Sequence, residues 1–172
     1  MGDRHRINVL FVCNDNAVRS LMAESLLQRL GGMRFRAFSA GSADVDDPEP
    51  DPRTVRALSE AGLPIAGLRR KRWAEFARPG APHMDLVVTL CDASAGEPMP
   101  DMPGEPGTAH WSHPNPRHVH PDDEAAAFRQ VLHEIRRHVE LLVNLPDEHV
   151  DRLVLEARAR ELAEQAHRDA GH

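Results

Sequence analysis

Tyrosine is absent from this 172-residue chain, lysine occurs once and cysteine twice. Two cysteines are too few for the disulfide framework of a small secreted scaffold, so we expect a protein of the reducing cytoplasm. No apolar run is long enough to span a membrane, and the polar start Met1–Arg6 lacks the apolar core of a signal peptide. The net charge of −6 argues against general binding to nucleic acid or to a membrane surface.

The hydrophobic pattern alternates between short buried strands and amphipathic helices. Strands are expected over 7–12, 34–40, 84–90 and 108–111, and helices over 20–30, 51–62, 69–76 and 123–145. The four prolines and three glycines of 92–107 predict a long mobile loop. Strands that alternate with helices predict a parallel sheet covered on both faces, with its ligand site at the carboxyl ends of the strands.

The last part of the chain, 146–172, is predicted to be a helical extension of a domain formed by 1–145. Its apolar residues fall on two nearly opposite helix faces, whereas a helix that packs only on its own domain needs one. The first face has Val150, Leu153, Val154 and Ala157, and the second has Leu155, Ala159, Leu162 and Ala166. A helix with two apolar faces can pack on its own domain and on a partner chain, so a homodimer contact is one interpretation and a frayed alanine-rich tail is the other.

The most informative motif directly follows the first strand. It reads Cys13, Asn14, Asp15, Asn16, Ala17, Val18, Arg19 and Ser20. A loop between a strand and a helix directs its backbone N–H groups and the positive helix end at one point, which suits a tetrahedral oxyanion. In that field the Cys13 thiol is expected to ionise well below its free pKa of roughly 8.5 and to act as the nucleophile. Arg19 would grip two oxygens, and Ser20 would donate to the sulfur.

Other interpretations of these residues are weaker. Cys13 alone is compatible with a buried structural cysteine, but the strand before it and the helix after it favour an anion loop. A nucleotide-binding P-loop is excluded because no G-x4-G-K-[ST] motif occurs. Four histidines crowd one segment at a spacing that matches no standard metal site, so we expect no metal. They are His110, His113, His118 and His120.

Several segments resemble the low-molecular-weight protein tyrosine phosphatase superfamily, and within it the thioredoxin-coupled arsenate reductases. The superfamily resemblance rests on 9–13 with Asn16, Arg19-Ser20 and Met22-Ala23-Glu24, and the reductase resemblance on 38–41, 85–91 and 110–112 leading to Pro116. It covers about 7–145. It implies a three-layer α/β/α fold around a four-stranded parallel sheet, here with an extra C-terminal helix.

The resemblance also implies a reaction. The Cys13 thiolate would attack arsenate, Cys91 would be the resolving thiol, and no bound cofactor would be needed. The position of the family's third cysteine holds Pro98, so an external thiol reductant is required: thioredoxin, glutaredoxin with glutathione, or mycothiol. Either this reductant opens a Cys13–Cys91 disulfide or a small thiol attacks the Cys13 adduct directly. Cys91 as a core residue at a strand end is the alternative.

The superfamily's acidic residue, an aspartate before a proline, is replaced by Asn115 in this chain. Asparagine cannot transfer a proton, so His113 or His118 would have to substitute, or turnover would be slow. Arg117 and His118 form a polar rim where phosphotyrosine phosphatases have aromatic residues, although Trp73 or Trp111 could supply a wall. The sequence therefore favours an arsenate reductase. A tyrosine phosphatase and a poorly catalytic oxyanion-binding protein remain alternatives.

Overall fold

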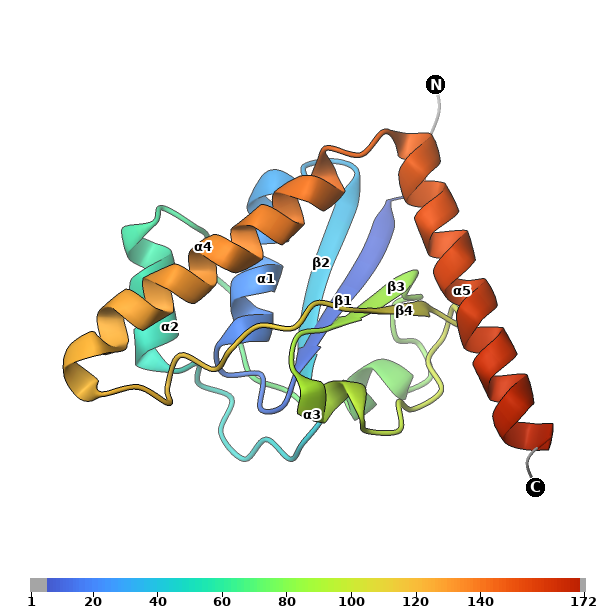
Figure 1. Cartoon of the computed structure of the whole chain (residues 1–172), viewed down its shortest axis with the longest axis horizontal. Coiled ribbons are helices and arrows are strands. Elements are labelled where there is room, and N and C mark those ends of the chain that lie inside the picture. The colour runs from blue at the N-terminus through green and yellow to red at the C-terminus, as the bar shows by residue number, and fades with distance from the viewer. Residues whose placement is uncertain (1–5, 171–172) are drawn as a thin grey trace.

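The computed structural model describes residues 6–170 and contains one sheet of four parallel strands in the order β2–β1–β3–β4 (Figure 1). The strands are β1 (Ile7–Cys13), β2 (Phe35–Gly41), β3 (Leu86–Thr89) and β4 (Gly107–His110). All four occur where the sequence predicted strands, within a few residues at their ends. The parallel α/β fold with an additional C-terminal helix is thereby confirmed.

The central strand β1 divides the core between the two faces of the sheet. Successive side chains of a strand point to opposite faces. Phe11 and Cys13 accordingly lie in one cluster of buried residues, and Leu10 and Val12 lie in the other. Cys13 is fully buried at the last position of β1. The strand thus places the thiol on the helical face of the sheet, at its carboxyl edge.

Three helices cover that face of the sheet: α1 (Arg19–Leu30), α2 (Pro52–Glu60) and α4 (Glu124–Val143) (Figure 1). Helix α2 begins as the sequence predicted, because the Asp51 carboxylate accepts a hydrogen bond from the backbone N–H of Arg53 at 2.9 Å and Pro52 occupies the first helical position. The N-terminus of α2 therefore has a fixed position next to the loop after β1.

The opposite face is covered mainly by irregular structure. The helix expected over 69–76 is wrong: only a short 3-10 helix, η1 (Trp73–Ala77), forms. The cause is pairing with β2, since Gly41 donates to the carbonyl of Lys71 at 2.7 Å and bridges to Arg72, which holds this segment extended. The loop predicted over 92–107 likewise begins with a short helix, α3 (Asp92–Ala95).

Helix α5 (Asp147–Ala170) packs against β4 at the edge of the sheet (Figure 1). Its first predicted apolar face is buried, with Val150, Val154 and Ala157 inside and Leu153 partly covered. The second face, represented by Leu155 and Leu162, is exposed. Within residues 6–170 no helix is long and apolar enough to cross a membrane. The division of the chain at 145 and 146 stays a prediction.

Glycine at position 107 lets α5 approach the sheet closely. A Cβ atom there would lie 2.5 Å from the Cβ of Ala157 and 2.5 Å from the backbone nitrogen of Arg158. The Arg158 guanidinium also donates to the Asp85 carboxylate at 2.9 Å. The buried face of α5 is therefore part of the folded core and is fastened by an ion pair.

Candidate active site

The loop between β1 and α1 is held from behind by the end of β2. The N–H groups of Ser42 and Ala43 donate to the carbonyls of Cys13 and Asn14 at 3.0 and 2.9 Å. A Cβ atom at Gly41 would lie 2.9 Å from the Asn14 carbonyl oxygen, so only glycine permits this approach. Two carbonyls of the loop are therefore directed away from its centre.

Asn16 fixes the middle of the loop. It is fully buried and has a φ of 56°, in the left-handed region that asparagine tolerates better than most residues. Its amide nitrogen donates to Ser20 Oγ at 2.7 Å and to Ser39 Oγ at 3.1 Å, and its carbonyl oxygen accepts from the backbone N–H of Lys71 at 2.9 Å. One side chain thus connects the loop to α1, to β2 and to the segment before η1.

The backbone N–H groups of the loop are mostly free of protein partners. Within residues 6–170, those of Asn14, Asn16 and Val18 donate to no protein acceptor. That of Ala17 donates to the Asp15 carboxylate at 3.1 Å, while the Ala17 carbonyl accepts from Thr54 Oγ1 at 2.9 Å. Several donors next to one thiol form the kind of cradle that binds an oxyanion.

Ser20 Oγ lies 2.9 Å from the Sγ atom of Cys13. Burial raises the pKa of the Cys13 thiol above its ordinary value, and hydrogen bonds from the Ser20 side chain and backbone oppose this rise. The Asp15 carboxylate raises the pKa further, whereas Arg19 lowers it. The expected pKa well below the free value is therefore wrong for this structure, because desolvation outweighs the stabilising contacts.

Arg19 begins α1 and is almost completely buried. Its guanidinium donates to the backbone carbonyl of His113 at 2.8 Å, which anchors one edge of the planar group. Among residues 6–170 its other N–H groups have no acceptor at hydrogen-bonding distance, so the fork can bind a second acceptor. The segment after β4 therefore positions the arginine that the motif predicted as the clamp.

A buried acid–base pair lies behind the loop. The Ser39 hydroxyl donates to the Glu24 carboxylate, and the Lys71 ammonium lies 3.9 Å from the same carboxylate. Burial raises the pKa of Glu24 and lowers that of Lys71. The only lysine of the chain is thus placed inside, next to the hydrogen-bond network of Asn16 and Ser39. The sequence pattern showed no sign of this pair.

Asn115 makes a different set of contacts from those of an acid. Its carbonyl oxygen accepts from the backbone N–H of Arg117 at 3.0 Å and from Nε of the same residue at 3.3 Å. The Arg117 guanidinium in turn donates to the Asp15 carboxylate in the loop. Asn115 therefore orients Arg117, which lies at the rim of the loop.

The two predicted substitute acids, His113 and His118, lie in different surroundings. His113 is buried, its Nε2 atom lies 2.9 Å from Nδ1 of His138, and burial lowers its pKa to about 4. It is therefore neutral at pH 7, and its predicted role as the acid is wrong. The side chain of His118 is exposed.

The two tryptophans do not form an aromatic wall around the thiol. Trp73 is buried in the cluster on the opposite face of the sheet from Cys13. The Trp111 ring stacks on His138 at 5.1 Å and packs against Phe11 at 5.9 Å. Trp73 is buried and Trp111 is partly covered, and both line a pocket beside α3 whose lining does not include Cys13.

Cys91 lies at the same sheet edge as Cys13. Strands β1 and β3 are parallel neighbours with Val12 opposite Thr89, so Cys91 comes two residues after the end of the adjacent strand. Its thiol donates to Ser94 Oγ at 3.2 Å, it is 6% exposed, and both cysteines are free thiols in one core cluster. The strand pattern predicted this shared edge correctly.

The four histidines of the crowded segment point to different partners. Within the described part of the chain, no group of three or more histidine, cysteine, aspartate or glutamate side chains is placed to hold a metal ion. His110 contacts Thr89 and Asp92, whereas His113 faces His138. His110 and His113 therefore each have side-chain partners of their own.

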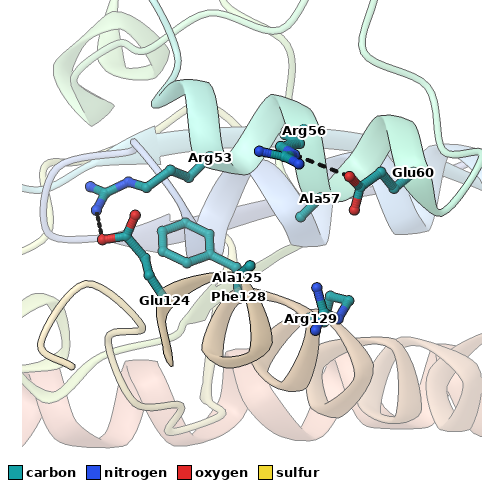
Figure 2. Close-up of a pocket in the computed structure, with 8 residues that line it drawn as sticks. All are labelled: Arg53, Arg56, Ala57, Glu60, Glu124, Ala125, Phe128 and Arg129. Carbon is teal, nitrogen blue, oxygen red and sulfur yellow. Dashed lines mark hydrogen bonds and ion pairs between the residues drawn. The ribbon is translucent and has the colours of Figure 1, made fainter. Parts of the chain in front are cut away.

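A separate pocket lies between α2 and α4, and none of its lining residues comes from the loop (Figure 2). Arg53 stacks on the Phe128 ring at 5.1 Å and bonds to Glu124 at 2.5 Å, and Arg56 pairs with Glu60 (Figure 2). The carboxylates of Glu124 and Glu60 thus offset the positive charges of Arg53 and Arg56. The contacts fasten the N-terminus of α2, whose Thr54 supports the loop, to α4.

A central strand that ends in a buried thiol, an amide loop and a buried arginine together define an enzyme that attacks tetrahedral oxyanions with cysteine. The profile of the low molecular weight phosphotyrosine protein phosphatase family matches residues 8–155, and the chain belongs to this family.

The relatives of this chain include arsenate reductases as well as phosphatases. An arsenate reductase of Bacillus licheniformis is 30% identical over 130 residues, which cover 74% of this chain and 88% of the relative. The crystal structure of an arsenate reductase from Archaeoglobus fulgidus is 31% identical, with a TM-score of 0.59, over 80% of this chain and 99% of that one. A Vibrio cholerae phosphotyrosine phosphatase shares the fold at 20% identity and a TM-score of 0.64, over 80% of this chain and 95% of that one. The resemblance to the reductase branch is thereby confirmed.

Proposed function

We propose that this enzyme is an arsenate reductase that uses Cys13 as nucleophile, Arg19 as clamp and the amides of residues 14–20 as oxyanion cradle. The observation on which this depends is the second thiol: Cys91 lies at the same sheet edge as Cys13, on the neighbouring strand. A phosphatase needs one thiol, whereas reduction of arsenate needs two.

The chemistry begins with the thiolate. Cys13 sulfur attacks arsenic and forms an S–As bond, and one oxygen leaves as water. Asn115 accepts hydrogen bonds from Arg117 and His113 is neutral, so the proton for this oxygen comes from the substrate, from solvent or from the exposed His118. Arg19 and the loop amides stabilise the charge on the remaining oxygens.

The second step transfers the electrons. The Cys91 thiolate attacks the sulfur of Cys13, the electron pair of the S–As bond stays on arsenic, and arsenite is released. Arsenic gains two electrons as the two thiols become a disulfide, which an external thiol reductant then opens. Both thiols are free, so formation of a disulfide needs a local movement of Cys91 and of the short helix α3 that follows it. Its four residues and the long irregular segment after it favour such a movement.

The test compares three proteins under anaerobic conditions with arsenate: the parent, Cys13→Ser and Cys91→Ala. Mass spectrometry should detect the Cys13–Cys91 disulfide and one arsenite per chain in the parent, and no arsenite with Cys13→Ser. Cys91→Ala should stop at the Cys13 adduct and release arsenite only when a small thiol is added. Hydrolysis of p-nitrophenyl phosphate at full rate by Cys91→Ala, without arsenite from the parent, would instead establish the phosphatase.

We also propose two partners. The physiological reductant is a thioredoxin, a glutaredoxin with glutathione, or mycothiol, and parallel assays with each would identify it. The exposed face of α5, with Leu155 and Leu162, supports a homodimer. Sedimentation of the parent and of a Leu155→Glu/Leu162→Glu variant tests this, and a parent that is monomeric at high concentration rejects it.

A further inference from the structure

Arg117 makes contacts beyond those of a surface arginine. Its side chain is 28% exposed, and its guanidinium donates to the Asp15 carboxylate, which is 21% exposed. The Nε atom donates to Asn115, and the Nη2 atom donates to Asp15 in the loop that holds Cys13. Asn115, at the position where an acid was expected, therefore holds the Arg117 side chain in place.

The Asp15 carboxylate binds two groups that a bound oxyanion would also seek. One of its oxygens accepts from the backbone N–H of Ala17 at 3.1 Å, and the other accepts from Arg117. Ala17 N–H belongs to the loop amides, and the Arg117 guanidinium forms an ion pair with the Asp15 carboxylate. The Asp15 carboxylate thus occupies one N–H donor of the loop and one cation at the rim of the loop.

We propose that Arg117 is a second oxyanion-binding arginine, which Asp15 holds in place until an inorganic oxyanion takes the guanidinium over. The inference rests on the proposed function and deepens it, because it names a specificity-determining residue. Asp15 is an internal competitor for the oxyanion, and Asn115 is a positioning residue that aims the guanidinium. No bond is made or broken in this exchange.

The arrangement selects for a small, doubly charged oxyanion. A free arsenate or phosphate exposes a charged oxygen at the mouth of the loop, where Arg117 can bind it through a charge-assisted hydrogen bond. An aryl ester places an uncharged ester oxygen and a ring at the same position. Arg117 therefore favours inorganic oxyanions over aryl esters.

Titration calorimetry with inorganic phosphate tests the proposal without turnover. Arg117→Ala should weaken phosphate binding about 10-fold to 100-fold, the range of one hydrogen bond to a charged group. Asp15→Asn should strengthen binding, because the competing charge is gone, and this gain should disappear in the Arg117→Ala background. Arg56→Ala, which removes an exposed arginine outside the loop, controls for net charge and should change binding less than twofold.

The two single variants distinguish this exchange from a purely structural ion pair. A structural pair predicts that both variants loosen the loop and weaken binding, whereas the proposal predicts opposite signs. The binding ratio of inorganic phosphate to phenyl phosphate should also fall in Arg117→Ala. Weaker binding by Asp15→Asn, or an Arg117→Ala affinity within twofold of the parent, would overturn it. If Arg117→Ala does not fold, Arg117→Lys takes its place. The proposal then predicts weaker phosphate binding by Arg117→Lys and stronger phosphate binding by Asp15→Asn.

These outcomes are independent of arsenate reduction. A protein that binds phosphate in the expected pattern but releases no arsenite would reject the proposed function and leave the role of Arg117 intact. A protein that reduces arsenate while Arg117→Ala binds phosphate normally would reject the role of Arg117 alone.

Discussion

Replacing Ser20 with alanine removes the hydroxyl that lies 2.9 Å from the Cys13 sulfur. Ser20 is fully buried, so no water takes its place, and Asn16 keeps its second hydrogen bond to Ser39 at 3.1 Å. The variant therefore tests how much one buried hydroxyl contributes to the stability of the Cys13 thiolate.

The size of the effect follows from the burial of the thiol. A hydrogen bond to a charged group contributes about 1.5–3 kcal/mol, which corresponds to roughly one to two pKa units. Burial already raises the pKa of Cys13, and the Ser20 hydrogen bonds lower it. Loss of the hydroxyl should therefore raise the pKa further and reduce the thiolate fraction at pH 8 by about 10-fold to 100-fold.

Alkylation by iodoacetamide measures this fraction, because only the thiolate reacts. Peptide mapping by mass spectrometry separates the reaction of Cys13 from that of Cys91, and rates from pH 7 to pH 10 give the apparent pKa. Ser25→Ala is the matched control, since Ser25 is a fully buried serine of the same helix whose hydroxyl donates to Pro64 at 2.5 Å. It should lower stability without changing the reactivity of Cys13.

A result in which Ser20→Ala and Ser25→Ala change the alkylation rate equally would refute the reasoning. The hydroxyl of Ser20 would then act only through packing. A fall in rate at every pH with an unchanged apparent pKa would have the same meaning, because it would indicate altered access instead of altered ionisation.

Three further predictions concern the surroundings of the site. His113 has a pKa of about 4 against an ordinary 6.5, so the free energy of unfolding should be highest above pH 6.5 and fall by roughly 3 kcal/mol as the pH drops to 4. In urea titrations, the His113→Asn variant should show a correspondingly smaller pH dependence. Gly107→Val forces side-chain atoms into Ala157, so it should cost about 2–3 kcal/mol and expose α5 to hydrogen exchange, and native-like protection of α5 would argue against the close contact. Thr54→Val removes the hydrogen bond to the Ala17 carbonyl; we expect a loss of about 1–2 kcal/mol in thermal unfolding and weaker phosphate binding, and an unchanged Kd would show that the loop does not need this support.

The nucleophile and its arginine could be predicted because their information is local. Cys13 ends an apolar run and Arg19 begins an amphipathic helix, so sequence spacing alone places both at the carboxyl edge of the sheet. The same argument placed Cys91, since it directly follows the apolar run 84–90. Parallel strands bring such positions together whatever the rest of the chain does.

Features that depend on distant partners were not predictable. The pKa of Cys13 depends on complete burial under α1 and neighbouring segments, and the pKa of His113 depends on burial and on His138, 25 residues further along the chain. Asn115 was expected at an acid position, but its contact with Arg117 and the ion pair to Asp15 join segments 102 residues apart. Neither the hydrophobic periodicity nor the composition of the sequence indicates which distant residues form such pairs.

The burial of Lys71 has a practical consequence for labelling. The chain has this one lysine, and its side chain is only 10% exposed. Amine-directed cross-linkers and surface coupling through lysine will therefore find few targets on the folded protein. Incorporation of 13C-lysine during expression needs no accessible amine and would give a single set of lysine side-chain signals, next to Glu24 and behind the oxyanion loop. Those signals would serve as an NMR probe of the loop, free of overlap from other lysines.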